Sequence, residues 1–152
     1  MAGVRRGGVT LRITVKSNEF IPSRGSNEAA GYDLYADIEN ELEIRPHETV
    51  KVGTGVCIEL DKGKCGLIFA RSGIATKQGL RPANAVGLID SDYRGELIVA
   101  LHNDTNINQK ICPKQRIAQL VIVDCHTPPL EVVDNLSDTT RGDGGFGSTG
   151  VY

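Results

Sequence analysis

The sequence predicts an all-β domain, a sandwich or a barrel, and three observations lead to that class. Short apolar stretches rich in Val, Ile and Leu recur along the chain. Turn-forming segments such as residues 61–64 and 103–106 separate them. The 152 residues include 18 Gly and 6 Pro, a composition that favours turns and short strands over long helices. Evenly spaced short strands are typical of β-sandwiches and β-barrels.

Nine stretches have the length and residue types of strands. In chain order they are residues 9–15, 32–36, 50–52, 55–60, 66–69, 85–89, 96–101, 117–123 and 131–133. Residues 55–60 and 65–69, on either side of the Asp61-Lys62-Gly63-Lys64 turn, are expected to form a hairpin. The one helix that the pattern predicts is short, residues 72–78, with Gly79 as its C-cap.

The C-terminal part departs from a self-contained sandwich. Pro128-Pro129 cannot continue a ladder of hydrogen bonds and indicates a hinge. The strand-like residues 130–133 that follow could pair away from their own core, even with another chain. We therefore expect a β domain over residues 1–133, with residues 1–8 as a loose tail, and a flexible glycine-rich arm over residues 134–152. On composition the arm is either a disordered tail or a segment that orders on a ligand.

The net charge, the length of the apolar runs and the cysteine spacing exclude several classes of binding partner. The formal net charge is −2, so a general polyanion binder is excluded and no nucleic-acid partner is expected. No apolar run reaches the roughly 20 residues that a membrane span needs, so no membrane partner is expected. The four cysteines show no metal-binding spacing and are expected to be buried or surface thiols. Without a targeting signal, a cytoplasmic or nuclear location is the default expectation.

Residues 87–96 bring apolar residues into a turn that carries two carboxylates and an aromatic ring, Asp90, Asp92 and Tyr93. A carboxylate held at the end of a strand can orient or deprotonate an attacking water. The alternative is that both Asp residues only terminate a hairpin.

Two further segments have the chemistry of phosphate sites. Arg71-Ser72-Gly73 follows a strand and opens the predicted helix, where anions bind, although Ser72 could also be a plain N-cap. The arm residues 141–150 combine an Arg and a Phe with five glycines, which allow close approach of the backbone to a phosphate. The arm is not a Walker loop, because no Gly-Lys-Ser/Thr follows.

Five segments, in order, resemble the five motifs of the homotrimeric dUTPase (deoxyuridine 5′-triphosphate nucleotidohydrolase) family. They are residues 30–34 (AGYDL), 71–73 (RSG), 87–95 (GLIDSDYRG), 116–120 (RIAQL) and 141–150 (RGDGGFGSTG). The resemblance implies a distorted β-barrel or jelly-roll-like sandwich whose C-terminal strand is exchanged in a trimer. It also implies hydrolysis of dUTP to dUMP and pyrophosphate with Mg²⁺, which limits uracil in DNA and supplies dUMP for dTMP synthesis.

The resemblance assigns roles on the nucleoside side of the site. Asp90 is the catalytic carboxylate that activates the water attacking the α-phosphorus. Tyr93 packs on the deoxyribose and excludes a 2′-hydroxyl. The hairpin over residues 84–93, continuing to residues 96–98, reads uracil mainly through backbone groups. The binding residues expected there are Asn84, Gly87 and Ile89.

On the phosphate side, the resemblance assigns binding to Arg71, Ser72, Gly73 and Gln119. Arg116 orients its neighbours. No direct protein ligand to the Mg²⁺ is expected, but Asp33 could reach the water shell of the metal. The arm closes over the nucleotide, and its substrate-binding residues are Arg141, Phe146, Gly147, Ser148 and Thr149, with Phe146 stacked on uracil.

In the family each site draws on three chains, so a homotrimer with shared active sites is expected. Motifs one, two and four come from one subunit, motif three from a second and the arm from the third. Two alternatives remain: a dCTP deaminase-like enzyme of the same fold, and a module that binds dUTP as a signal.

Overall fold

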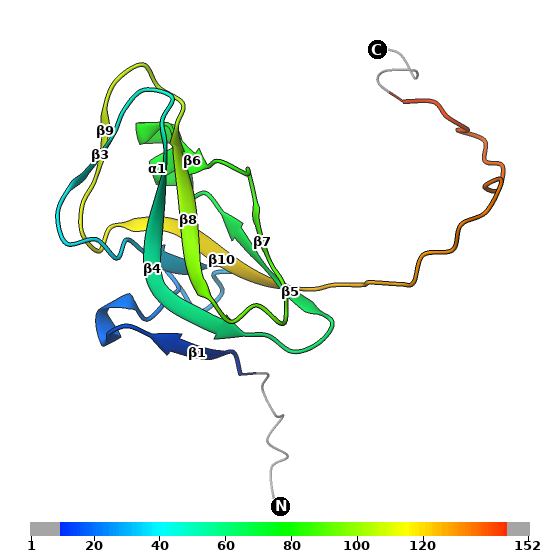
Figure 1. Cartoon of the computed structure of the whole chain (residues 1–152), viewed down its shortest axis with the longest axis horizontal. Coiled ribbons are helices and arrows are strands. Elements are labelled where there is room, and N and C mark those ends of the chain that lie inside the picture. The colour runs from blue at the N-terminus through cyan, green and yellow to red at the C-terminus, as the bar shows by residue number, and fades with distance from the viewer. Residues whose placement is uncertain (1–9, 146–152) are drawn as a thin grey trace, which may run out of the picture.

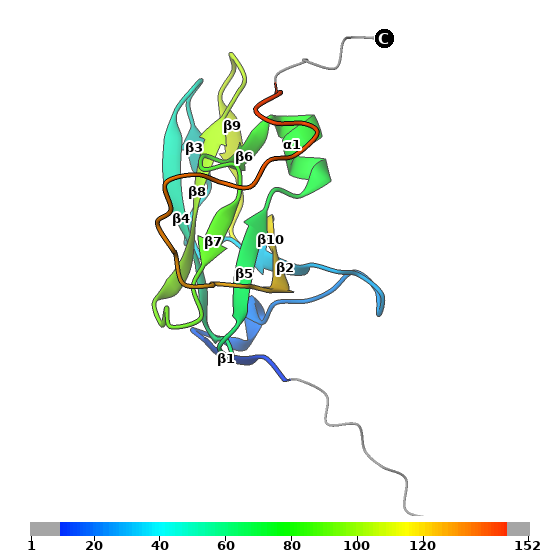
Figure 2. The same cartoon turned by 90° about the vertical axis from the view of Figure 1, so that its right-hand side faces the viewer.

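The computed structural model describes residues 10–145. The strands form two four-stranded sheets and a two-stranded ribbon. Figures 1 and 2 show the two sheets stacked as layers, with the ribbon at one end. The β4 sheet has the order β1 (Arg12–Val15), β4 (Thr49–Glu59), β8 (Glu96–Asn103) and β6 (Leu80–Pro82). The β5 sheet has the order β2 (Tyr32–Tyr35), β10 (Arg116–Asp124), β5 (Lys64–Phe69) and β7 (Gly87–Ile89). The ribbon pairs β3 (Leu42–Ile44) with β9 (Gln109–Ile111).

The core lies between the two sheets. Strand β4 alternates buried and less buried residues, and its inward side chains include Val52, Val56 and Ile58. The opposite sheet contributes Leu120 and Ile68, which belong to the same buried cluster. The described strands form two open sheets rather than a closed barrel, which confirms the all-β class in its sandwich form.

Two predicted strands are one strand in the structure. Residues 50–52 and 55–60 both belong to β4, whose pairing with β8 shifts register between Gly53 and Cys57. Gly55 has a φ of 67° at this irregularity. A bulge therefore interrupts the apolar alternation without ending the strand. Strands β3, β6 and β9 were not predicted, because each is short and interrupted by charged or polar residues, so none forms a continuous apolar stretch.

The predicted hairpin between residues 55–60 and 65–69 is wrong. Strand β4 pairs with β1 and β8, whereas β5 pairs with β10 and β7, so the two neighbours in sequence lie in different sheets. The Lys64 amide does donate to the carbonyl of Asp61, and the turn exists. However, the Cys125 amide donates to the carbonyl of Gly63, so the strand after the turn is paired with the end of β10. The turn chemistry was predictable, but the pairing partner was not.

The predicted helix is confirmed as α1 (Ser72–Gln78). Gly79 ends it in the left-handed conformation with a φ of 63°, and its amide donates to the carbonyl of Ala75. A β-carbon at Gly79 would collide with the methyl group of Thr105, so glycine is required twice over. Arg71 occupies the N-cap position, so the alternative of Ser72 as N-cap is wrong and Ser72 is the first helical residue.

Beyond β10 the chain runs away from the sandwich as an extended segment (Figure 1). Residues 130–133 form no strand with the described part of their own chain, and Leu130 and Val132 are 96% and 98% exposed. Their pairing with another chain stays a prediction. Among residues 10–145 there is no helix long and apolar enough to cross a membrane.

Candidate active site

The predicted phosphate-binding residues gather around a buried carboxylate on β2. Asp33 is 7% exposed and uses both of its oxygens. Its Oδ1 accepts from Arg71 Nε at 2.7 Å, and its Oδ2 accepts from Arg116 Nη1 at 3.2 Å. The carboxylate thus fixes two guanidinium groups, one before α1 and one at the start of β10. Two guanidinium groups and one carboxylate leave one positive charge uncompensated, so the cluster is suited to binding an anion.

Gln119 forms the other wall of this pocket. Its Nε2 donates to the carbonyl of Ala70 at 2.9 Å and so holds the turn that leads to Arg71. Its Oε1 would lie 2.6 Å from a β-carbon at Gly31, so any larger residue there would displace the Gln119 amide from its present position. Arg71, Ser72, Arg116 and Gln119 line one pocket of about 360 Å³. The structure therefore brings together motifs one, two and four, as the sequence predicted for one subunit.

Asp33→Asn tests whether this carboxylate serves the arginines or a metal. We expect the free energy of unfolding to fall by about 1–3 kcal/mol, because hydrogen bonds to two charged partners are weakened. For the dUTP hydrolysis with Mg²⁺ that the five motifs imply, we also expect the KM to rise, because Arg71 loses its anchor, while the Mg²⁺ concentration for half-maximal turnover stays unchanged. Thermal unfolding and a Mg²⁺ titration of the initial rate measure both. A stable variant with an altered Mg²⁺ requirement would instead assign Asp33 to the water shell of the metal.

Asp90 and Tyr93 lie in the loop between β7 and β8. The Tyr93 amide donates to the carbonyl of Asp90 at 3.2 Å, which closes a turn at the loop tip. The Tyr93 hydroxyl donates to the carbonyl of Glu96 at 3.0 Å, and a β-carbon at Gly95 would collide with that hydroxyl. Arg94 Nη1 donates to the carbonyls of Ser91 and Tyr93 at 2.8 and 3.1 Å. The loop holds the ring in place and leaves the Asp90 side chain exposed.

The hairpin predicted over residues 84–93 is also wrong in its pairing. Strand β6 pairs with β8 in the β4 sheet, whereas β7 pairs with β5 in the other sheet. The segment therefore bridges the two layers instead of forming a ladder with itself. Asn84 and Gly87 are still neighbours, since a β-carbon at Gly87 would lie 3.7 Å from Asn84 Nδ2. Ile89 packs against the core, so any contact that it makes with a base is through its backbone.

Within one chain, Asp90 is far from the phosphate pocket. Gly66 pairs with Ile89, so Asp90 lies beside Cys65 at the start of β5, whereas Arg71 follows the end of β5. Arg71 is six positions along the extended chain from Cys65, a span of about 20 Å. Asp90 lines its own pocket of about 530 Å³, which shares no lining residue with the phosphate pocket. The two predicted half-sites lie at opposite ends of one sheet.

The surface between the half-sites is apolar. Val121 pairs with Leu67, and Leu67 pairs with Leu88, so the three side chains form a row on the outer face of the β5 sheet. Leu88 is 63% exposed, and Val121 and Leu67 are half-buried. The sequence reasoning assigned no role to this face, although alternate apolar residues on β5 and β10 signal a sheet covered on both sides.

The described part of the arm stays apart from both half-sites (Figure 1). Arg141 Nε donates to the carbonyl of Gly144 at 2.8 Å in a local turn, and Gly142 has a φ of 57°. The remaining arm residues predicted to bind substrate, Phe146, Gly147, Ser148 and Thr149, lie outside the described residues. Gly73 is exposed in the first turn of α1.

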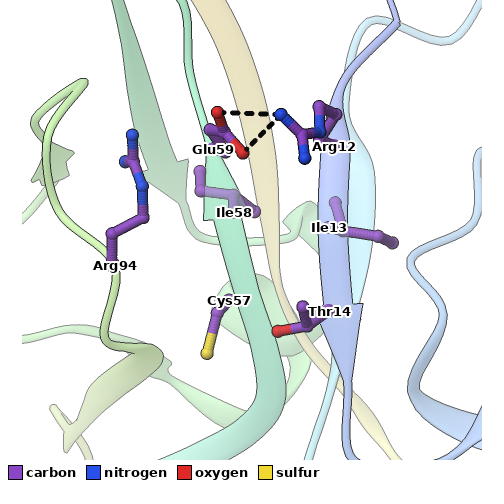
Figure 3. A pocket seen from close by; sticks show the side chains of 7 residues that line it. All are labelled: Arg12, Ile13, Thr14, Cys57, Ile58, Glu59 and Arg94. Atoms are coloured by element: carbon purple, nitrogen blue, oxygen red, sulfur yellow. Dashed lines mark hydrogen bonds and ion pairs between the residues drawn. The ribbon is translucent and has the colours of Figure 1, made fainter.

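A further pocket, of about 170 Å³, opens on the β4 sheet and contains none of the predicted site residues. Figure 3 shows Arg12 and Arg94 on opposite sides of Glu59. Arg12 Nη1 forms an ion pair with Glu59 Oε2 at 3.1 Å, which neutralises one wall. Cys57 and Thr14 lie farther along the same strands. The pocket is shallow and exposed, and we assign no part of the reaction to it.

The fold is a jelly-roll-like β-sandwich, and the phosphate pocket at one end of the β5 sheet carries a net positive charge that suits a small anion. Comparison with known proteins identifies the class more closely. A family model described as dUTPase matches residues 18–150, and the chain belongs to the dUTPase family. The family predicted from the five motifs is confirmed.

Several relatives are named deoxyuridine 5′-triphosphate nucleotidohydrolase. The protein of Desulfitobacterium hafniense is 46% identical over 132 residues, 86% of this chain and 87% of the relative. That of Burkholderia lata is 40% identical over 141 residues, 92% and 95% of the two chains. Among solved structures, the dUTPase of Staphylococcus bacteriophage 80alpha with dUPNHPP matches with a TM-score of 0.84 at 30% identity, covering 93% of this chain and 99% of that one. The fold and the enzyme class are those predicted.

Proposed function

We propose that the chain hydrolyses dUTP to dUMP and pyrophosphate at a site assembled from the two half-sites. Membership of the dUTPase family supports the activity. The observation that carries the site is the pairing of Arg71 and Arg116 with a buried Asp33, next to Ser72 and Gln119. This pocket suits a triphosphate, and the exposed Asp90 loop supplies a carboxylate and a ring. The expected consequences are less dUTP available for incorporation into DNA and a supply of dUMP for dTMP synthesis.

The chemical step is an in-line displacement at the α-phosphorus. Asp90 accepts a proton from a water molecule while the water oxygen bonds to the α-phosphorus. The bond between the α-phosphorus and the oxygen bridging to the β-phosphorus breaks, and its electron pair stays on pyrophosphate. Ser72 donates a hydrogen bond where this negative charge develops, and Arg71 stabilises it further. Gln119 positions the phosphate chain against the same wall.

We propose that Mg²⁺ arrives bound to the triphosphate. Among residues 10–145 no group of three His, Cys, Asp or Glu side chains gathers to hold a metal. The best-placed carboxylate, Asp33, has both oxygens paired with arginines. Mg²⁺ retains waters readily and binds phosphate oxygens, so these residues fit a metal carried by the substrate. When bound, it neutralises phosphate charge.

A homotrimer with shared sites accounts for the separation of the half-sites. The row of Leu67, Leu88 and Val121 between them offers an apolar surface to a second copy. If the phosphate-pocket end of one copy faces the Asp90 end of the next, three copies can close a ring, because the contact joins two different patches. The exposed apolar side chains of Leu130 and Val132 would be covered by exchange of the C-terminal strand.

The arm, residues 134–152, is proposed to come from the third chain. Residues 134–143 are exposed in the single chain, so they are available to cross to a neighbour. Phe146 would stack on uracil, and Arg141, Ser148 and Thr149 would hold the β- and γ-phosphates, with Gly147 also in contact with the substrate. Closure of the arm excludes water and strengthens each charged contact within the site. The β domain, residues 1–133, supplies the rest.

Substrate choice tests the function and the role of Tyr93 together. We expect pyrophosphate release from dUTP with Mg²⁺ and little from UTP, dCTP or dTTP. In Tyr93→Ala the preference for dUTP over UTP should fall by about tenfold or more, because a ring that fills the 2′ position is removed. Tyr93→Phe, which keeps the ring and loses only the bond to Glu96, is the matched control. If Tyr93→Ala and the unmodified chain discriminate equally between dUTP and UTP, Tyr93 takes no part in sugar selection. Release of pyrophosphate or of ammonia from dCTP would favour the deaminase alternative.

A further inference from the structure

Two cysteines lie side by side in the wall of the Asp90 pocket. Cys65, on β5, pairs with Val123 of β10, and Cys125 is two residues farther along. Residues two apart on a strand point to the same face, so Cys125 is the diagonal neighbour of Cys65. Both side chains line the Asp90 pocket. No local pattern joins these two cysteines, since their separation in the chain fits no metal or redox motif.

The environment distinguishes the two thiols. Cys65 is 8% exposed, and burial, then a hydrogen bond with Cys125 and the charges of Cys125 and Asp90, raise the pKa of its thiol. Cys125 is half-buried and lies just beyond the end of β10, where its amide bonds to Gly63. Cys125 is therefore the thiol that a small reagent reaches first, and the more buried Cys65 lines the same pocket.

We propose that Cys65 and Cys125 form a reversible thiol–disulfide site that hydrogen peroxide oxidises and that lowers dUTP turnover when closed. The Cys125 thiolate attacks one peroxide oxygen, the O–O bond breaks, and a sulfenic acid forms while hydroxide takes up a proton to give water. The Cys65 sulfur then attacks the Cys125 sulfur. The S–O bond breaks, and the departing hydroxide combines with the Cys65 proton to give a second water. Two thiols are oxidised to one disulfide, and one peroxide is reduced to two waters.

Closing this bond moves two parts of the proposed site. Diagonal neighbours have Cα atoms about 7–8 Å apart, and a disulfide needs less than about 7 Å, so the strand ends must draw together slightly. Cys125 lies one residue past the end of β10 and three residues before the Pro128-Pro129 hinge of the arm, so a movement of Cys125 has to strain or break its backbone bond to Gly63. Cys65 lies beside Asp90, because Gly66 pairs with Ile89. The disulfide thus displaces the origin of the arm and the neighbourhood of the catalytic carboxylate together.

The test uses the full chain, first reduced and then exposed to hydrogen peroxide before alkylation of the remaining thiols. Mass spectrometry of a non-reducing digest should find one peptide pair joined through Cys65 and Cys125. Turnover of dUTP should fall by about tenfold or more, as expected for a small displacement of catalytic groups, and dithiothreitol should restore it. Cys65→Ser and Cys125→Ser should each lose the joined peptide and the sensitivity to peroxide, measured as treated over untreated rate.

Cys57→Ser and Cys112→Ser are the matched controls, because neither thiol lines the Asp90 pocket, and both variants should leave the response unchanged. Absence of the joined peptide, or loss of activity that persists in Cys125→Ser, overturns the proposal. The proposal is also overturned if the joined peptide forms and the turnover of dUTP does not fall. The effect on turnover rests on the proposed function, but the peptide is read without any assay. If the reduced chain fails to hydrolyse dUTP, the proposed function is refuted. The disulfide can still be detected in that case, because the joined peptide is measured without any activity.

Discussion

Asp90→Asn is expected to bind dUTP nearly as tightly as the unmodified chain while kcat falls by about 10²–10⁴-fold, the usual range for loss of a general base. Asn has the same shape and is exposed in the β7–β8 loop, so neither the fold nor the turn closed by Tyr93 should change. The amide of the introduced Asn cannot accept a proton from water. Steady-state pyrophosphate release gives kcat, and calorimetry with a non-hydrolysed analogue gives the affinity.

Asp92→Asn is the matched control, since Asp92 lies two residues away in the same exposed loop and lines the same pocket. It should retain most of its turnover. If Asp92→Asn collapses kcat and Asp90→Asn does not, the wrong carboxylate has been assigned. If both retain turnover, the activating base lies elsewhere.

Deletion of residues 138–152 should lower kcat/KM for dUTP by about 10²-fold or more, because the site loses its cover and its contacts to the distal phosphates. The described part of the deleted segment, residues 138–145, makes only local hydrogen bonds around Arg141 and is largely exposed. The melting temperature and the oligomeric state should therefore stay the same.

Deletion of residues 2–8, which removes a segment of the opposite terminus, is the control and should leave kcat/KM unchanged. Light scattering and thermal unfolding separate a loss of cover from a loss of assembly. A chain lacking residues 138–152 that turns over dUTP at the original rate would show that the arm takes no part in the reaction.

Local chemistry was enough to predict α1 and its end at Gly79, because a helix C-cap depends on residues adjacent in sequence. Alternation of apolar residues was enough to predict most strands. It could not predict that β4 and β5 join different sheets, since the partner of β5 is decided by the distant β10. For the same reason the segment over residues 84–93 bridges the layers instead of pairing with itself.

The residues proposed for each half-site could be predicted from its motif. The distance between the two half-sites within one chain could not. The ion pairs of Asp33 with Arg71 and Arg116 join three elements that are far apart in the sequence. The span from Cys65 to Arg71 follows from the register of β5 with β7, which no local pattern contains. That span is what makes a second copy of the chain necessary to the proposed site.

Mixed assemblies test most directly whether Asp90 of one chain acts on a substrate held by Ser72 of another. Asp90→Asn and Ser72→Ala chains, each inactive alone, are co-expressed with different tags, and assemblies carrying both tags are isolated. In a cyclic trimer every such assembly contains one site with both residues intact, so we expect about one third of the original kcat per trimer. Mixed assemblies as inactive as the parents would show that each chain builds its site alone and would contradict the account.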